Sequence, residues 1–302
     1  MTVHLYIPTL NGGKRFVELL DRLDQQTLVV GRCVVIDSGS TDGTVEAARA
    51  HGCEVMGLDG EGFDHGGTRQ RAIDAHPEAD VYCLLTQDAV LADASALARL
   101  VDAFKDRRVG LAYGRQLPHP GAALLESHAR LFNYPPYSQF RSLADAPTHG
   151  IKTIACSNSF AAYRREALAQ VGGFPRGTIM GEDVIVAGKM LLTGWKLGYV
   201  ADACVHHSHN YTIKEEFERY FDIGVFHADN RWIFDSFGRA GGEGMRYALS
   251  EVRYVVRRNP LLLPKVACSL GAKWLGYRLG LLSKRLPRRV CRAFSMYKGY
   301  WD

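Results

Sequence analysis

Residues 3–13 read VHLYIPTLNGG, a short β-type run that meets Pro8 and passes into two glycines. The proline is expected to stop the hydrogen-bond ladder, and the glycines allow backbone amides to approach a ligand closely. An amphipathic segment over residues 14–24 and a second strand pattern at Cys33–Asp37 follow. A strand, a polar turn, a helix and another strand predict a right-handed βαβ unit with a parallel sheet.

The same alternation continues along the chain. Further strands are predicted at Cys53–Leu58, Val81–Leu85 and Gly110–Tyr113, and further helices near residues 43–51, 67–76 and 93–105. This order predicts an α/β fold in which a mostly parallel, Rossmann-like sheet is flanked by helices. Ligands of such sheets bind at the carboxyl ends of the strands, so the residues that follow each strand are candidates for a site.

The pattern becomes mixed in the second half. After a loop-like stretch at 134–150, the predicted elements are a strand at Ser159–Tyr163, a helix at 182–193 and a strand at Lys196–Val200. Thr212 and Glu215 have the spacing of a capping box, which predicts one long helix through about Phe237.

Composition indicates a globular protein. At 302 residues with 47% apolar residues, the chain can bury a substantial core. The seven cysteines lack paired close spacing, which is typical of reduced thiols in the cytosol. The first residues lack the basic start and apolar run of a signal peptide or anchor, so we expect the catalytic part to stay in the cytoplasm.

Charge is distributed unevenly. The net charge is +5, yet residues 245–302 hold thirteen Lys and Arg against two acids, a local sum of +11. The stretch Gly238–Gly244 contains four glycines and indicates a hinge, so we expect a catalytic domain over 1–237 and a basic tail over 245–302. A nucleic-acid-binding protein would spread its basic residues over a reading surface, and this pattern therefore argues against a nucleic-acid partner.

Apolar and basic residues alternate in the tail. The apolar ones are Leu261, Leu262, Leu263, Val266, Leu270, Trp274, Leu275, Leu279 and Leu282, and the basic ones are Lys265, Lys273, Arg278, Lys284 and Arg285. Because charges interrupt every window long enough to span a bilayer, the tail is predicted to be helical and to lie in the interface of a membrane. The alternative is a pair of ordinary packed helices with solvated basic faces.

The second predicted strand ends in a candidate nucleotide-binding residue. Asp37 lies at the strand tip and is followed by small hydroxyl and glycine residues through Gly43. A carboxylate there can bind the N–H edge of a pyrimidine and a ribose hydroxyl. The alternative is a helix N-cap made by Thr41 or Asp42, and both interpretations can hold for different residues.

The run Phe63–Gln70 places a glycine pair before a helix. Thr68 is a candidate cap, which would put Arg69 in the first turn, where a cation opposes the helix dipole. A diphosphate between the arginine and the helix N-terminus would explain a cation at this position. The alternative is an arginine that is merely solvated.

Acidic and histidine residues follow later strands. Asp88 comes after Val81–Leu85, where one carboxylate can hold Mg²⁺ or Mn²⁺ together with a nucleotide diphosphate, although a lone aspartate after a strand is usually a turn former or helix cap. Glu182 and Asp183 open a helix, which dipole complementarity alone would also explain.

Three histidines, at 206, 207 and 209, follow a strand-like run. In an extended chain only alternate residues share a face, so they cannot all bind one metal, and a closed structural zinc site is not expected.

Taken in order, these motifs resemble family-2 glycosyltransferases of the GT-A fold, and especially bacterial rhamnosyltransferases that build surface polysaccharides. The similarity covers residues 3–235. The segments that carry it are Ile7–Gly13, Asp37–Gly43, Phe63–Gln70, Thr86–Ala89, Gly181–Asp183 and His206–Tyr211.

The resemblance implies a role for each candidate residue. Those expected to bind the nucleotide sugar are Pro8, Thr9, Asn11, Asp37, Arg69 and Gln87, with Arg69 near the diphosphate. Asp88 would hold the divalent metal, with His207 or His209 as an extra ligand. Asp183 would be the general base, and Glu182 its partner in an acidic pair. Thr86 departs from the family's Asp-x-Asp pattern, which makes a histidine ligand more plausible.

The implied activity is inverting, metal-dependent glycosyl transfer. The expected donor is dTDP-L-rhamnose, and the expected acceptor is a lipid-linked or polysaccharide glycan of the cell surface, such as lipopolysaccharide, reached from the cytoplasmic face of the inner membrane. The alternatives are a family-2 transferase for another sugar, a catalytically silent nucleotide-binding or scaffold protein, and a nucleotidyltransferase that releases pyrophosphate. The sequence does not decide between a monomer and an oligomer.

Overall fold

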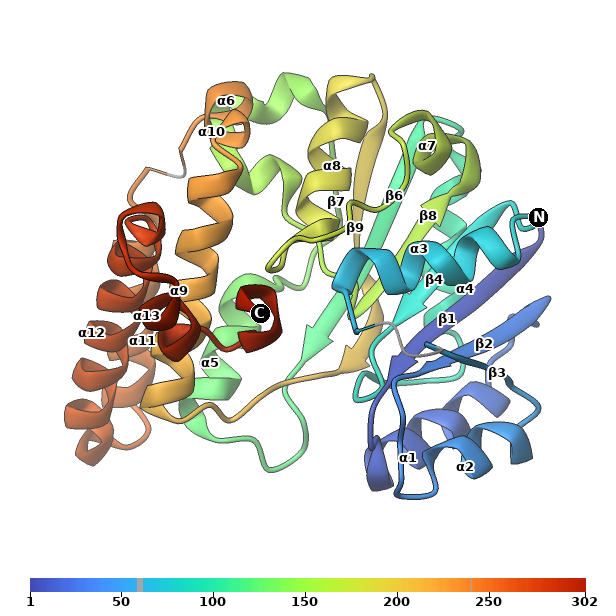
Figure 1. The fold of residues 1–302 in the computed structure, drawn as a ribbon, viewed down its shortest axis with the longest axis horizontal. Coiled ribbons are helices and arrows are strands. Elements are labelled where there is room, and N and C mark those ends of the chain that lie inside the picture. Colours follow the sequence, from blue (N-terminus) through green and yellow to red (C-terminus); the bar gives the residue numbers. More distant parts are fainter. Residues whose placement is uncertain (59–61, 240) are drawn as a thin grey trace.

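The computed structural model describes residues 1–58, 62–239 and 241–302 (Figure 1). Its strands form one sheet in the order β3-β2-β1-β4-β8-β6-β9-β5, and β7 pairs with β9. The strands are β1 (Val3–Thr9), β2 (Arg32–Asp37), β3 (Glu54–Gly57), β4 (Val81–Leu85), β5 (Val90–Leu91), β6 (Val109–Leu117), β7 (Gln139–Arg141), β8 (Phe160–Arg164) and β9 (Lys196–His206). β1 to β4 are parallel, as are β6 and β9, whereas β5, β7 and β8 run antiparallel to their neighbours. The predicted α/β fold with a sheet flanked by helices is confirmed, but the sheet is mixed rather than mostly parallel, with four parallel and four antiparallel pairings among the described strands.

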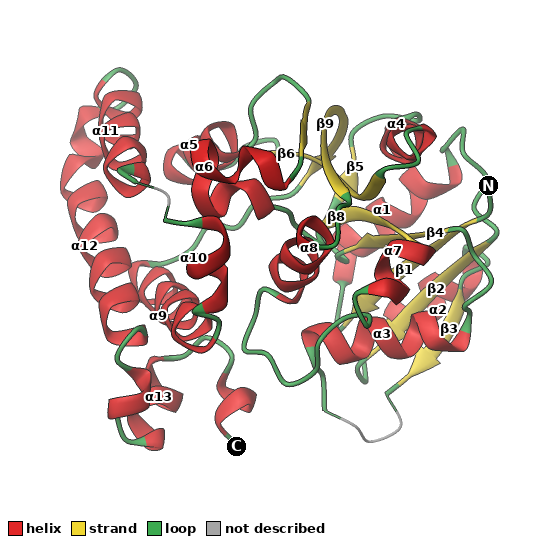
Figure 2. Cartoon of the chain, turned by 90° about the horizontal axis from the view of Figure 1, so that it is seen from above, coloured by secondary structure: helices red, strands yellow, loops and turns green. Residues whose placement is uncertain are grey.

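Helices cover both faces of the sheet. They are α1 (Gly13–Asp24), α2 (Thr44–Ala50), α3 (His65–Ala75), α4 (Ala96–Asp102), α5 (Leu124–Asn133), α6 (Ala146–His149), α7 (Arg165–Gln170), α8 (Glu182–Leu192) and α9 (Ile213–Asp229). Leu5 and Ile7 of β1 belong to the apolar cluster of α1 and α4, whereas Tyr6 belongs to that of α3 and α8. Alternate residues of a strand therefore serve opposite faces, and Figure 2 shows α1 and α3 on opposite sides of the sheet.

Pro8 does not stop the ladder on both sides. β1 pairs with β4 only through Tyr6, but its pairing with β2 continues through Thr9 and Asp37. Proline is tolerated because the β4 side is already unpaired at this point. The strand therefore carries Thr9 to the tip of β2.

The second half differs from prediction where distant strands pair. β6 and β9 are longer than expected and run side by side, with a register shift after Gly114. α5 was not predicted, and the loop-like stretch 134–150 contains β7 and α6. Pairing with strands that are distant in the sequence determines β6, β7 and β9, and local sequence patterns do not report such pairing.

The predicted single helix from Thr212 to Phe237 is wrong. The capping box is confirmed, because Glu215 N–H donates to the Thr212 hydroxyl (3.2 Å) and the Glu215 carboxylate accepts from Thr212 N–H (2.8 Å). However, α9 ends at Asp229 and a separate helix, α10 (Trp232–Phe237), follows. Asn230 ends α9, where both its backbone N–H and its Nδ2 donate to the carbonyl of Phe226 (each 3.0 Å).

The tail forms the helices α11 (Glu243–Val256), α12 (Leu263–Gly280) and α13 (Arg288–Phe294). α12 lies along α9, as Figure 1 shows. A side chain added at Gly280 would collide with the carbonyl oxygen of Phe221, and one at Gly276 with that of Phe217. The two helices therefore touch backbone to backbone. The predicted hinge Gly238–Gly244 includes residue 240, which lies outside the described residues.

The end of the tail returns to the sheet side of the molecule. The backbone N–H groups of Met296 and Tyr297 donate to the Asp222 carboxylate of α9 (2.9 and 3.0 Å), and the Tyr297 hydroxyl donates to the carbonyl of Phe63. Among the described helices, none combines the length and apolar character that crossing a membrane requires.

Candidate active site

Asp37 is held at the tip of β2 by a full set of donors. Its Oδ2 accepts the backbone N–H groups of Gly39 and Ser40 (both 2.9 Å), and its Oδ1 accepts the hydroxyls of Ser40 (2.5 Å) and Thr9 (3.2 Å). Burial acts to raise the pKa of Asp37, but these hydrogen bonds outweigh it, and the pKa is lowered. An ionised carboxylate therefore lies at this edge, beside the buried Pro8 of β1.

Asn11 and Gln87 hold the loop that follows β1. Asn11 has a positive φ of 48°, its N–H donates to the Ser40 hydroxyl (2.8 Å), and its side-chain oxygen accepts from Thr41 N–H (2.9 Å). Gln87 exchanges two hydrogen bonds with the backbone of Leu10 (2.8 and 3.2 Å). Both predicted site residues thus join the loops after β1, β2 and β4. Neither Thr41 nor Asp42 is the N-cap of α2, which is Gly43.

Asp88, His207 and His209 come together at the same edge. One ligand atom from each lies within 4.8 Å of the others, and the His207 and His209 Nε2 atoms are 3.4 and 3.8 Å from the Asp88 carboxylate. His206 points elsewhere, since its Nδ1 lies 2.9 Å from the carbonyl of Pro118. The expected alternation of the histidines is therefore confirmed.

The chemistry of this cluster fits a divalent cation. Gln116 Oε1 lies 2.9 Å from His207 Nδ1 and also receives a hydrogen bond from Arg130, which can only donate. Nδ1 must then carry a proton, which leaves Nε2 as the atom that faces the carboxylate of Asp88. Two acceptors this close need a proton or a metal ion between them, and this buried pairing is typical of histidine ligands.

The protonation of the cluster supports the same conclusion. Burial lowers the pKa of His209 to about 4, with a further contribution from His207. Burial acts to raise the pKa of Asp88, but the two histidines outweigh it, and the pKa lies below its usual range. At neutral pH the carboxylate is ionised and His209 is neutral, as metal ligands must be.

The run Phe63–Gln70 is arranged differently from its prediction. Asp64, not Thr68, is the N-cap of α3, because its carboxylate accepts the N–H of Gly67. The Thr68 hydroxyl instead accepts the N–H of Asp64 (3.2 Å), as in a capping box. The helix therefore starts earlier than expected, and Arg69 lies beyond its first turn.

Arg69 is buried against the acidic pair. Its Nη1 lies 3.1 Å from Glu182 Oε1, which also accepts from Asn158 Nδ2 (2.9 Å). Burial acts to raise the pKa of Glu182, but Arg69 outweighs it and the pKa is lowered. The structure thus brings Arg69 to Glu182, and its proximity to a donor diphosphate stays a prediction.

Asp183 is half-buried in the first turn of α8, as predicted. Its Oδ1 accepts the N–H of Val184 (2.8 Å) and its Oδ2 accepts that of Asn158 (3.1 Å). Burial and the neighbouring Glu182 raise the pKa of Asp183 to about 7. Near neutral pH this carboxyl can therefore both accept and release a proton.

One short loop joins the two halves of the site. Gln116, which orients His207, donates through Nε2 to the Ser157 hydroxyl (2.9 Å), and the next residue, Asn158, binds both Glu182 and Asp183. Sequence analysis missed Gln116, Asn158 and Arg130. The signal that could have found Gln116 and Asn158 is their position beside the ends of β6 and β8, whereas Arg130 lies within α5.

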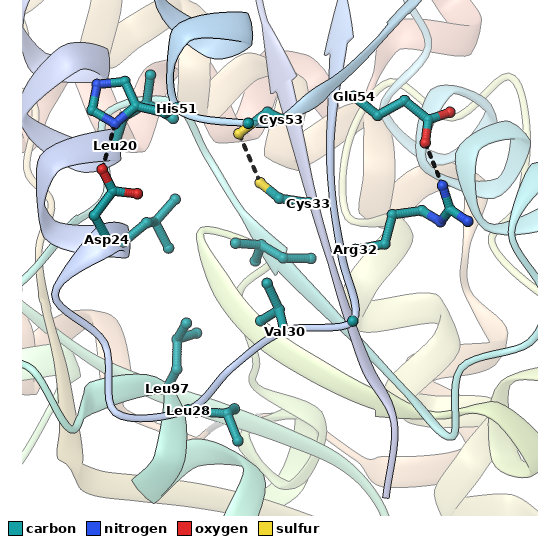
Figure 3. Close-up of a pocket in the computed structure, with 14 residues that line it drawn as sticks. Leu20, Asp24, Leu28, Val30, Arg32, Cys33, His51, Cys53, Glu54 and Leu97 are labelled. Atoms are coloured by element: carbon teal, nitrogen blue, oxygen red, sulfur yellow. Dashed lines mark hydrogen bonds and ion pairs between the residues drawn. The ribbon is translucent and has the colours of Figure 1, made fainter.

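Three pockets lie at different places in the fold. One, of about 380 Å³, lies between α1, α2 and the start of β2, where the Cys33 and Cys53 sulfurs are 3.1 Å apart (Figure 3). None of the predicted site residues lines it. The other two, of about 480 and 270 Å³, are both lined by His209 and therefore lie beside the metal cluster.

Comparison with known proteins gives a consistent result. Residues 5–172 match the family described as Glycosyl transferase family 2. The chain is 47% identical over its whole length to the O-antigen chain rhamnosyltransferase RfbN of Salmonella typhimurium, 96% of which is covered. It is 44% identical to the O-antigen chain rhamnosyltransferase WbaN of Salmonella anatum, with 99% of this chain and 95% of that protein covered.

Solved structures show a similar fold. The mannosyltransferase PcManGT of Pyrobaculum calidifontis, in complex with GDP-Man and Mn²⁺, has a TM-score of 0.58 at 21% identity, over 99% of this chain and 84% of that one. TarS 1–349 of S. aureus, in complex with UDP-GlcNAc, has a TM-score of 0.52 at 16% identity, over 94% and 92%. The family match and the full-length relatives together show that this chain belongs to glycosyl transferase family 2 and has the GT-A fold.

Proposed function

We propose that the protein transfers L-rhamnose from dTDP-L-rhamnose, with inversion, to a lipid-linked or polysaccharide acceptor during cell-surface glycan synthesis. The observation that carries the choice of sugar is the identity of 47% and 44% to two relatives named O-antigen chain rhamnosyltransferases, over nearly the whole of each chain. The catalytic domain is residues 1–237, as the sequence predicts.

The donor nucleotide binds at the end of the sheet that holds Asp37. The ionised carboxylate lies beside Thr9 and the loop that Asn11 and Gln87 fix in place, so it can accept hydrogen bonds from the base or the ribose. Because these groups are already fixed in the protein, little conformational entropy is lost on binding. Pro8 and Arg69 complete the donor site in this proposal.

The metal ligands are Asp88, His207 and His209, with Mg²⁺ or Mn²⁺ as the ion. When bound, such an ion neutralises charge on the diphosphate leaving group. The protein holds the ligands ready through Gln116, which fixes the tautomer of His207.

Asp183 accepts the proton of the acceptor hydroxyl as that oxygen attacks the anomeric carbon from the face opposite the nucleotide. Two backbone N–H groups fix the direction of its carboxylate, and a pKa of about 7 makes it a stronger base than an ordinary aspartate. Glu182 stays ionised beside Arg69 and helps to raise this pKa. Direct displacement needs no covalent intermediate.

The decisive experiment is a donor panel. Purified protein is incubated with several nucleotide sugars, a divalent metal and lipid-linked acceptors, and the released nucleotide is measured. Release of dTDP from dTDP-L-rhamnose, dependent on acceptor, is the expected result. Release of pyrophosphate would indicate a nucleotidyltransferase, turnover of a different donor would change the sugar, and donor binding without turnover across the panel would indicate a silent protein.

We also propose that the tail lies on the cytoplasmic face of the inner membrane. Besides its charge of +11, the tail exposes large apolar side chains, with 86% of Leu261 and 66% of Trp274 accessible. Apolar residues insert at the level of the headgroups while basic residues attract anionic lipids.

Vesicle flotation tests the membrane proposal without removing the tail. Trp274→Ser combined with Leu275→Ser should lower binding to anionic vesicles by about tenfold or more, since each buried side chain contributes about 1.5–3 kcal/mol. Leu192→Ser is a matched control, because Leu192 at the end of α8 is as exposed (45%) as Leu275 (46%). Equal binding of all variants would refute the proposal.

A further inference from the structure

The pocket of about 270 Å³ lies between α5, α9 and the tail helices α11 and α12. His209 lines it, so it opens directly beside the candidate metal ligands. Tyr134, at the end of α5, also lines it. The pocket therefore adjoins the metal cluster.

Four cations and two acids line this pocket. Lys273 is neutralised, because its Nζ lies 3.1 Å from Glu216 and 3.8 Å from the buried Glu251. The Glu126 carboxylate accepts the N–H of Ala123 at the start of α5 (3.1 Å). Lys273 is therefore paired within the protein, whereas Glu126 accepts from a neutral amide and keeps its charge.

The other three cations are Arg130, Arg219 and Lys265. Arg130 donates to the neutral amide of Gln116, and Arg219 lies over the ring of Tyr211, 5.7 Å from its centroid. Lys265 is exposed at the first turn of α12. In the part of the chain that the structure describes, none of the three forms an ion pair with a carboxylate. The pocket thus keeps positive charge available for a ligand.

The position of the pocket indicates which substrate it serves. Asp37 ends β2, whereas His209 follows β9, and four strands lie between these two in the sheet. The metal cluster therefore separates the pocket from the donor nucleoside side. A ligand of this pocket therefore lies away from the proposed nucleoside site, as an acceptor would.

We propose that this pocket binds a phosphate group of the acceptor, so that the tail supplies part of the acceptor site. The proposal rests on the glycosyl transfer proposed above. Phosphate oxygens accept hydrogen bonds from arginine and lysine donors, and an arginine fork can bind two oxygens at once. Arg219 from α9 and Lys265 from α12 would hold the phosphate from two sides.

Two acceptors with the same glycan separate phosphate binding from sugar binding. One carries a lipid diphosphate at its reducing end and the other is the free glycan. Lys265→Gln and Arg219→Gln should each raise the KM for the diphosphate acceptor by about tenfold or more, the range for a charge-assisted hydrogen bond. The KM for the free glycan and for the donor should not change. Arg219→Lys, which keeps the charge, should recover part of the affinity.

A matched control comes from the same tail. Arg257 is exposed at the end of α11 and lies outside the pocket lining, so Arg257→Gln removes the same charge without touching the pocket. It should leave the KM for both acceptors unchanged. An equal rise for both acceptors, a rise in donor KM, or an equal effect of Arg257→Gln would overturn the proposal.

Direct binding keeps the proposal testable if the donor assignment fails. Titration of inorganic pyrophosphate in the presence of a chelator should show binding that Lys265→Gln and Arg219→Gln weaken and Arg257→Gln does not. Because no turnover is needed, loss of rhamnosyl transfer alone would leave this result standing. Identical titrations for all four proteins would exclude an anion site in the pocket.

Discussion

Asp37 and Asp183 lie at opposite parts of one sheet edge, and the backbone holds both in the same way. Each accepts two N–H groups through its carboxylate. Yet the pKa of Asp37 is lowered, whereas that of Asp183 is raised to about 7. Asp37 also receives the hydroxyls of Ser40 and Thr9, while Asp183 is buried beside the carboxylate of Glu182. The position of an aspartate at the end of a strand or helix therefore does not fix its pKa. The neighbouring charges and hydrogen bonds do.

The largest expected effect comes from replacing Asp88, the proposed metal ligand. Asp88→Ala removes the anionic metal ligand, and loss of several kcal/mol of charge stabilisation corresponds to a fall in turnover of about 10⁴-fold or more. The fold should persist, since the carboxylate faces two histidines, and among the described residues no backbone N–H donates to it. Turnover measured with and without chelator checks this. Asp202→Ala, at an exposed position of β9, is the control, and parent activity that resists chelator would contradict the prediction.

Asp183→Asn tests the proposed general base with a change that preserves the shape of the side chain. Turnover should fall by about 10²–10⁴-fold, with donor binding unchanged, if this carboxylate is the base. Because folding raises the pKa of Asp183, its charged form opposes folding above pH 7, so the variant should be at least as stable as the parent at pH 8. Rates and melting temperatures of one preparation give both answers.

Two further measurements complete the test of Asp183. Glu182→Gln is the companion variant, because it removes the neighbouring charge and should shift the acidic limb of the pH–rate profile to lower pH. In the parent, kcat should fall as the pH drops below about 7, where Asp183 becomes protonated. Near-normal turnover of Asp183→Asn would exclude Asp183 as the base, and an acidic limb near pH 4 in the parent would contradict its raised pKa.

Gln116→Leu is expected to weaken metal binding indirectly, through His207. Without its amide oxygen, His207 loses the acceptor that fixes its tautomer, and metal affinity should drop by about 10- to 100-fold. Excess Mn²⁺ should then restore turnover, which distinguishes this change from loss of Asp88. Metal titration of activity measures it, and an unchanged midpoint would contradict the role given to Gln116.

Asp37→Asn should have the smallest effect on turnover. It keeps the shape but weakens the bonds from Gly39 and Ser40, so we expect a loss of about 1–3 kcal/mol in the free energy of unfolding at pH 7 and a rise in donor KM. Because the pKa of Asp37 is lowered in the fold, its stabilisation is present above the ordinary aspartate pKa and lost as the pH falls through the lowered value. Urea unfolding measures this effect. The free energies of unfolding of the variant and the parent should differ at pH 7 and become equal at acid pH.

The sequence predicted which residues follow the strands better than it predicted the hydrogen-bond partners and burial of those residues. The strand patterns at Val3–Ile7, Cys33–Asp37 and Val81–Leu85 agree with β1, β2 and β4, because buried parallel strands have a clear local pattern. The role of Gln116 was missed, since it reaches His207 only through the long-range pairing of β6 with β9. The protonation of Asp183 likewise depends on burial, which motif spacing does not report.

The close contact of α9 with α12 limits how this protein can exchange parts with its relatives. Gly276 and Gly280 lie against the backbone of α9 at Phe217 and Phe221, so a foreign tail with larger residues there could not dock. The boundary at residues 237 to 245 suggested by the glycine-rich stretch is therefore not a safe point for recombination. A transplantable module would begin at Thr212, before α9, and would carry both partners of the contact together.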